Sequence, residues 1–200
     1  MCGAAATCLI RHEGPLAGFT GSWATSLVRL SDGAELALGA GSVALPRGGG
    51  AAAWVCADGG ASPCAAWPAA LAALGCAADG SDCVLRAALF DGAGASVDAH
   101  ADLLAIPAAL VLPRARVHAF VSPTRNPDGS VSVYLNTNAT AVFVTLTTTE
   151  QGVFDDNAFL LTTAECPRIV NLLPIIGAGA VEPAALVASL RIEHLAIYSD

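Results

Sequence analysis

Short stretches in which apolar and polar residues alternate, each ending at a turn sequence, dominate this chain. Val131, Val133 and Leu135 share one face of such a stretch, while residues 141–147 carry valine and leucine on one face and threonine on the other. Successive side chains of a β-strand point to opposite faces of its sheet, so a period of two is typical of half-buried strands. The stretches follow one another with short turns between them, as in an antiparallel sandwich. We therefore predict an all-β fold.

The first half of the chain contains one interruption of this pattern. Residues 65–75 are rich in alanine and leucine, and Pro68 stands where the first turn of a helix tolerates proline. We predict a short helix there, inserted between two strands. Ser31-Asp32-Gly33 predicts a hairpin, because Asp-Gly readily adopts positive φ angles. The strands predicted around these features span residues 23–30, 34–38, 42–45, 52–57, 83–90 and 102–106.

A second series of strands follows residues 110–115, which we interpret as a junction. Strands are predicted over residues 116–121, 131–135, 141–147, 169–173 and 186–195. Six or seven strands in each half suit a sandwich of the immunoglobulin type. We predict two tandem Ig-like antiparallel β-sandwiches, the first with a short helical, cysteine-rich insertion. We predict an extension without regular structure over residues 1–19, a first sandwich over residues 20–113 and a second over residues 114–200.

The charge of the chain excludes several classes of partner. The formal net charge is −8, with only nine lysines and arginines and no basic run. Nucleic-acid binding depends on neutralising phosphates with basic side chains, so nucleic acid is excluded, as is an anionic membrane surface. The apolar run of residues 101–111 is interrupted by Asp102 and Pro107, far short of the roughly 18 apolar residues of a spanning helix. We predict no membrane segment.

The familiar catalytic and metal-binding motifs are missing. The sequence has no Gly-x-Ser-x-Gly, no His-Glu-x-x-His, no phosphate-binding glycine loop and no Cys-x-x-Cys. The four histidines are scattered singly: His12, His100, His118 and His194. We therefore assign no catalytic residue, no metal and no cofactor.

Four of the seven cysteines bracket the predicted helix: Cys56, Cys64, Cys76 and Cys83. Disulfides among them would fasten the insertion to its flanking strands, with three possible connectivities. The alternative is that several are small buried thiols in a reducing compartment. Both interpretations stay open, and the clustering favours disulfides.

Two features concern glycans. Asn138-Ala139-Thr140 is an N-glycosylation sequon between two predicted strands, where an exposed turn is expected. Trp67 lies in the insertion, where an exposed indole could stack on a sugar ring. Both residues are therefore candidate glycan sites.

A compact polar motif stands out in the second half. Asp155, Asp156 and Asn157 lie between Phe154 and Phe159. Asp and Asn side chains accept backbone N–H bonds in turns, and the two phenylalanines would pin the turn by burial. We interpret the motif as structural. A calcium site is the sharper alternative, although the Asp-x-Asp-x-Asp-Gly pattern of a calcium loop is missing.

Four segments of the second half occur in the order and spacing of one known domain: residues 131–133, 138–144, 152–161 and 189–198. Together they resemble the C-terminal Ig-like β-sandwich domain of β-mannosidases of glycoside hydrolase family 2. The first half is similar to the Ig-like domain that precedes it, through residues 30–33, 83–85 and 103–113, while residues 56–83 depart from the pattern.

The resemblance implies a non-catalytic accessory region whose partner is the catalytic barrel of a parent glycosidase. The catalytic glutamates of that family lie on the barrel, which takes about 250 residues. No glutamate here has the family's Asn-Glu context, so no catalytic residue is carried over. We expect the chain alone not to hydrolyse β-D-mannosides. The alternative is a stand-alone Ig-like module that binds carbohydrate or protein.

The resemblance also implies a secretory, lysosomal or extracellular location. Residues 1–18 lack the apolar stretch of a signal peptide. We therefore expect either a cytosolic chain or an internal piece of a longer protein.

Overall fold

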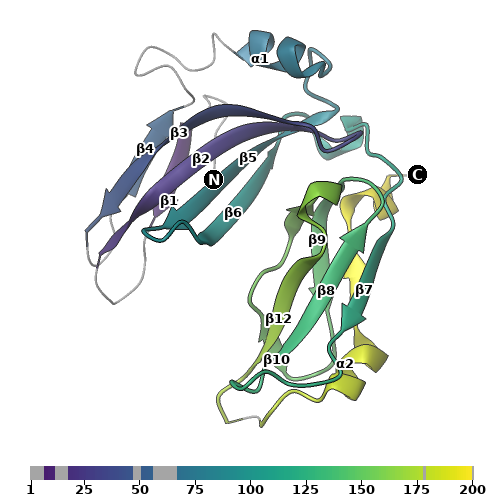
Figure 1. The fold of residues 1–200 in the computed structure, drawn as a ribbon. Coiled ribbons are helices and arrows are strands. Elements are labelled where there is room, and N and C mark those ends of the chain that lie inside the picture. Colours follow the sequence, from purple (N-terminus) through teal and green to yellow (C-terminus); the bar gives the residue numbers. More distant parts are fainter. Residues whose placement is uncertain (1–6, 12–17, 47–50, 56–66, 178, 200) are drawn as a thin grey trace. The chain divides into compact units, whose positions relative to one another are not determined.

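A computed structural model describes residues 7–11, 18–46, 51–55, 67–177 and 179–199, with the backbone alone for residues 7–11, 51–55 and Trp67 (Figure 1). The chain divides into two compact units. The first unit comprises Met1–Arg29 and Ala34–Val111, and the second comprises Leu30–Gly33 and Leu112–Asp200. Both units are built on antiparallel sheets, with only short helices beside them, which confirms the predicted all-β class.

The first unit is built on a four-stranded antiparallel sheet in the order β3-β2-β5-β6. Its strands are β2 (Phe19–Arg29), β3 (Glu35–Leu45), β5 (Cys83–Asp91) and β6 (Ser96–Leu103). A second pair joins β1 (Thr7–Arg11) to β4 (Ala51–Val55). The predicted helix is confirmed as α1 (Trp67–Leu74), and a 3-10 turn, η2, covers Pro107–Ala109. Helix α1 packs through Leu71 against buried Leu27 and Cys83.

Strand β3 corrects one expectation. Two strands over residues 34–38 and 42–45 were expected, with the glycines between them as a loop, but β3 runs unbroken. Gly41 lies opposite Trp23 of β2, and a Cβ on Gly41 would stand only 3.0 Å from the indole Nε1. The glycine therefore makes room for the tryptophan ring instead of turning the chain.

Two further boundaries in the first unit differ from expectation. Residues 7–11, expected to lack regular structure, form β1, because their backbone pairs with β4. The strand expected at residues 102–106 is β6, which starts earlier at Ser96. The Asp91 carboxylate accepts the N–H groups of Ala93 and Ala95, both at 2.9 Å, so the turn is tight and β6 follows it directly.

The second unit is a sandwich of a four-stranded and a three-stranded sheet, in the orders β10-β12-β8-β7 and β11-β9-β13. The first sheet contains β7 (Val117–Val121), β8 (Val131–Thr137), β10 (Gly152–Phe154) and β12 (Arg168–Pro174). The second contains β9 (Ala141–Thr147), β11 (Phe159–Leu161) and β13 (Arg191–Glu193). A 3-10 turn, η3 (Thr163–Glu165), links β11 to β12.

The core of the second unit takes residues from both sheets. Val133, Leu135 and Leu172 of the four-stranded sheet meet Leu146 and Leu161 of the three-stranded sheet, and all five are at most 1% exposed. The inward positions alternate with outward ones along β8, as the period of two predicts. This packing positions the loop between β10 and β11, which passes from one sheet to the other.

The strand expected over residues 186–195 is wrong over most of its length. Helix α2 (Pro183–Ser189) comes first, β13 is only three residues long, and η4 (Leu195–Tyr198) follows. Pro183 occupies the first turn, where its missing N–H costs nothing, and Leu186 buries the helix against the core. Among the helices that the structure describes, none has the length and apolar character needed to cross a membrane.

Candidate functional site

Asp155 of the polar motif is bonded to β12. Its Oδ1 accepts the backbone N–H of Asn171 at 2.8 Å, and its Oδ2 accepts the Asn171 side-chain amide at 2.7 Å. The Asp155 N–H in turn donates to the Asn171 carbonyl at 3.0 Å. Both carboxylate oxygens are therefore engaged on the four-stranded sheet, just past the end of β10.

Asn157, two residues later, is bonded to the opposite sheet. Its Oδ1 accepts the backbone N–H of Leu146 at 2.8 Å, and its Nδ2 donates to the Leu146 carbonyl at 3.0 Å. The side chain thus continues the hydrogen-bond ladder of β9 beyond β11. Ala158, which has a φ of 59°, follows and also donates its N–H to Asn157 Oδ1 at 3.1 Å.

Arg168, at the start of β12, contacts the motif as well. Its guanidinium is bonded to Asp156 Oδ2 and lies 4.2 Å above the centre of the Phe159 ring. It also lies 3.7 Å from Glu165 Oε1 and donates to the Leu160 carbonyl at 3.5 Å. The aromatic ring below the guanidinium and the two carboxylates beside it hold the Arg168 side chain in place.

Together these bonds form a clasp, by which we mean Asp155, Asp156 and Asn157 with their partners Arg168 and Asn171. The three side chains of the loop point to three separate partners, whereas a calcium ion needs six to eight oxygens converging on one point. We interpret the clasp as a structural device that holds the loop between the two sheets. Sequence reasoning missed Arg168 and Asn171, because nothing local marks them as partners of the loop.

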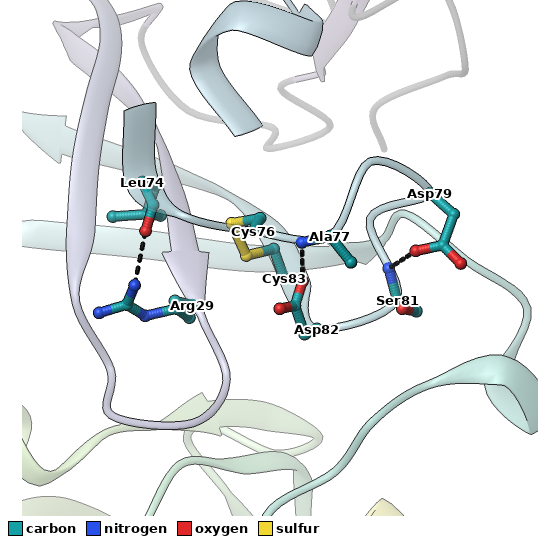
Figure 2. The surroundings of a disulfide bond; sticks show 8 residues. All are labelled: Arg29, Leu74, Cys76, Ala77, Asp79, Ser81, Asp82 and Cys83. Carbon is teal, nitrogen blue, oxygen red and sulfur yellow. Dashed lines mark hydrogen bonds between the residues drawn. A yellow bond between two sulfur atoms is a disulfide. The ribbon is translucent and has the colours of Figure 1, made fainter. Parts of the chain in front are cut away.

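The cysteine cluster contributes one disulfide among the described residues. Cys76, just after α1, is bonded to Cys83 at the start of β5, with their Cα atoms 6.1 Å apart (Figure 2). Cys56 and Cys64 lie outside the described residues, so their pairing stays a prediction. The Asp82 carboxylate lies within 4.8 Å of both sulfurs, but sulfurs bonded to each other are poor metal ligands.

Hydrogen bonds fasten the segment around this disulfide. Asp82 Oδ1 accepts the N–H of Ala77 at 2.7 Å, and Arg29 of β2 donates to the carbonyl of Leu74 at 2.7 Å (Figure 2). Asp79 Oδ1 accepts the N–H of Ser81 at 3.0 Å, and the bonds from the Ser81 backbone and hydroxyl lower the pKa of Asp79. The disulfide therefore belongs to a structural junction between helix and sheet.

Replacing both Cys76 and Cys83 with alanine is expected to lower the free energy of unfolding of the first unit by about 2.5 kcal/mol, the loss predicted for so short a disulfide loop. Thermal unfolding followed by circular dichroism measures this loss, and Cys166→Ala, a free cysteine in the second unit, serves as control. An unchanged melting temperature of the first unit in the double variant would show that the bond does not form.

The candidate glycan residues have different surroundings. Asn138 is exposed, and its Oδ1 accepts the N–H of Arg116 at 2.7 Å, whereas Thr140 of the same sequon is only 2% exposed. Trp67 is the first residue of α1, and its side chain lies outside the described part. Glycosylation of Asn138 and sugar stacking on Trp67 both stay predictions.

His194 is the buried titratable side chain nearest the C-terminus. It is 7% exposed, and burial lowers its pKa, so the imidazole is neutral near pH 7. Its Nδ1 has no hydrogen-bond partner within the described structure. The histidine lies between β13 and η4.

The outer face of the four-stranded sheet in the second unit carries apolar and aromatic side chains on each of its four strands, beside the uncharged polar residues of β8 and β12. Phe120, Tyr134 and Ile169 lie side by side on β7, β8 and β12, and Val153 and Leu173 pair on β10 and β12. Phe120, Val153 and Ile169 are 62%, 61% and 53% exposed. Of the outward positions described on these strands, none is Asp, Glu, Lys or Arg. We call these five residues the apolar face.

The other sheet of the sandwich is different. Its outward positions on β9 and β13 pair Thr147 with Arg191 and Thr145 with Glu193. Polar and charged residues are the usual covering of a sheet that faces water. The contrast shows that the apolar face is a particular property of one sheet.

Two packed antiparallel sheets around one core define the second unit as an Ig-fold domain, and comparison with known families specifies the type. Residues 112–197 match the family model Ig_mannosidase, an Ig-fold domain. The second unit is therefore similar to mannosidase Ig-fold domains, which confirms the resemblance to the C-terminal Ig-like domain of β-mannosidases. No functionally curated protein matches the chain by sequence.

Solved structures of two glycosidases share the fold. A β-D-mannosidase from Dictyoglomus thermophilum aligns with 95% of this chain at 13% identity and a TM-score of 0.58. The exo-chitosanase CsxA from Amycolatopsis orientalis aligns with 96% of it at 14% identity and a TM-score of 0.59. The chain spans only 22% and 24% of those two chains. It is thus similar to the Ig-like part of much longer enzymes.

Proposed function

We propose that this chain is a non-catalytic accessory region of a β-mannosidase-type glycoside hydrolase, which packs against and stabilises the catalytic barrel. The family match of residues 112–197 and the fold shared with two glycosidases support this role. More than three quarters of each of those enzymes lies outside the aligned part. We further propose that residues 20–113 and 114–200 are the two sandwich domains of this region.

The observation that carries the proposal is the apolar face. A soluble domain that faced water on this side would be expected to carry charged residues there, as its other sheet does. Depletion of charge together with enrichment in aromatic residues is the composition of an interface core. Phe120 and Tyr134, whose ring centres are 6.0 Å apart, supply the aromatic part of such a core. The outer face of this sheet is thus suited to form an interface with another protein.

The test measures whether this chain stabilises a barrel. The catalytic barrel encoded with or beside this chain is melted alone and with a saturating amount of the chain, and its melting temperature is expected to rise by mass action. The chain by itself is expected not to release p-nitrophenol from p-nitrophenyl β-D-mannoside. A barrel that melts at the same temperature with and without the chain would contradict the proposal.

Substitutions at two similarly exposed isoleucines test whether the apolar face is the contact surface. Ile169→Ser on the apolar face is expected to weaken the association by about tenfold, the effect of losing roughly 1.4 kcal/mol of contact. Ile197→Ser is the control, because Ile197 lies in η4 and is exposed to a similar extent, 49% against 53% for Ile169. Equal effects of the two substitutions would exclude the apolar face as the contact surface.

A further inference from the structure

A hollow of about 410 Å³ lies on the four-stranded sheet of the first unit, over β2, β3 and β5. It exists because small side chains stand side by side on three neighbouring strands: Ala24, Ala37, Gly39, Ala40 and Ala88. Phe90 lines it as well, and supplies an aromatic surface. Its volume falls within the range of small-molecule sites, about 300–1,000 Å³.

Polar groups gather in the same hollow. The hydroxyl of Ser26, a residue only 7% exposed, donates to Glu35 Oε1, and Arg86 Nη1 lies 3.7 Å from Glu35 Oε2. The three residues come from three strands, since Ser26 of β2 lies opposite Arg86 of β5, and Glu35 begins β3. A carboxylate acceptor and a guanidinium donor are therefore held next to each other beside an apolar floor.

A register shift in the sheet occurs at this place. The pairing of β2 with β3 changes between Thr25 and Ser26, so Thr25 lies opposite Gly39 while Ser26 lies opposite Ala37. The Thr25 hydroxyl donates to the Gly39 carbonyl at 3.4 Å. Such bulges re-aim side chains and are frequent beside binding sites.

The chemistry of the hollow restricts its ligand. Glu35 disfavours anions and Arg86 disfavours cations, so the ion pair selects a neutral molecule. A donor and an acceptor side by side suit adjacent hydroxyl groups, which can accept from one and donate to the other. The alanine floor and the Phe90 ring suit the apolar face of a ring. Neutral saccharides combine all three properties.

We propose that the hollow of the first unit binds a neutral saccharide unit. This inference goes beyond the packing role proposed above and does not depend on it. The residues that recognise the saccharide are Glu35 and Arg86 at the polar end, with Phe90 against the ring. The site is a binding site only, because nothing in the inference requires bond cleavage.

The test is an NMR titration of the full ¹⁵N-labelled chain. The neutral probes are methyl β-D-mannopyranoside, N-acetyl-D-glucosamine and D-glucose, with D-glucosamine and D-glucuronate as charged counterparts of glucose. We expect a neutral saccharide to shift the amide signals of β2, β3 and β5 with a dissociation constant of about 1 mM, a usual affinity for so few contacts. Absence of shifts with every neutral probe, or tighter binding of a charged counterpart, would overturn the proposal.

Variants that change the hollow without changing the core make the test specific. Ala37 is exposed, so Ala37→Leu fills the hollow without disturbing the packing, and is expected to weaken binding at least about tenfold. Ala188→Leu on the exposed side of α2 is its control. Shifts that persist in Ala37→Leu, or that gather around α1 and Trp67 instead, would overturn the assignment.

The polar end is tested by Glu35→Gln. This change keeps the size of the side chain but removes its charge, and is expected to weaken binding severalfold while leaving the melting temperature within a few degrees. Glu182→Gln is the matched control, since Glu182 is also paired with an arginine, Arg125, in the second unit. Equal saccharide affinity in the two variants would exclude Glu35 from the site.

Discussion

Replacing Leu172 with alanine is expected to lower the free energy of unfolding of the second unit by about 3–5 kcal/mol. Leu172 is fully buried on β12, with β8 and β10 on either side, and it packs in the core shared by the two sheets. The loss combines the transfer of its side chain to water with the cavity left between well-packed neighbours. A domain of this size has a total stability of roughly 5–10 kcal/mol, so the variant would be close to unfolding.

The neighbouring residue provides the control. Leu173 points to the opposite face of the same sheet and is 37% exposed, so Leu173→Ala is expected to cost less than about 1 kcal/mol. Urea unfolding of both variants, followed by far-ultraviolet circular dichroism, measures the difference. Equal losses in the two variants would mean that the orientation of β12 in the sandwich is wrong.

Replacing Asn157 with alanine is expected to cost about 2–4 kcal/mol, although the residue itself is exposed. Its side chain pairs with both the N–H and the carbonyl of Leu146 on β9, at 2.8 and 3.0 Å. Leu146 itself is only 1% exposed. Removing the Asn157 side chain leaves two backbone groups of the sandwich without their partner, and each such group costs about 1–3 kcal/mol when buried. The loop would also lose its attachment to the three-stranded sheet.

Asn136→Ala is the matched control, because Asn136 is an exposed asparagine on the outer face of β8. It is expected to change the free energy of unfolding by less than about 0.5 kcal/mol. Asn157→Asp is expected to fall between the two, since it keeps the acceptor for the Leu146 N–H and loses the donor. An Asn157→Ala variant as stable as Asn136→Ala would show that the clasp carries no stability.

The fold class could be predicted because the period of two is a local signal. The inward positions of β8 and β9 follow from their alternation, and α1 follows from an alanine-rich stretch with proline in its first turn. Helix α2 was missed because Leu190 to Glu193 alternate as a strand does, which concealed the helix before them. Short apolar segments do not distinguish a helix from a strand by periodicity alone.

The candidate sites could be predicted less well. The composition of the polar motif was visible, but its partners, Arg168 and Asn171, belong to a strand that reaches the loop only in the folded sandwich. The hollow of the first unit had no signature in the sequence, because alanines on three strands become a floor only when those strands pair. A local pattern records which residues share a face and does not record which faces meet.

The alternation of residues, read alone, determined that this protein is a β-sandwich protein, and four segments of its second half carried the resemblance to the Ig-like domain of β-mannosidases. Only the tertiary structure decided which of two adjacent leucines, Leu172 or Leu173, lies in the core, and that the other belongs to the apolar face. The physical reason is that both faces of β12 carry apolar residues, so its own pattern is ambiguous. Burial is decided by the sheet that packs opposite, and only one face of β12 has that partner within the second unit.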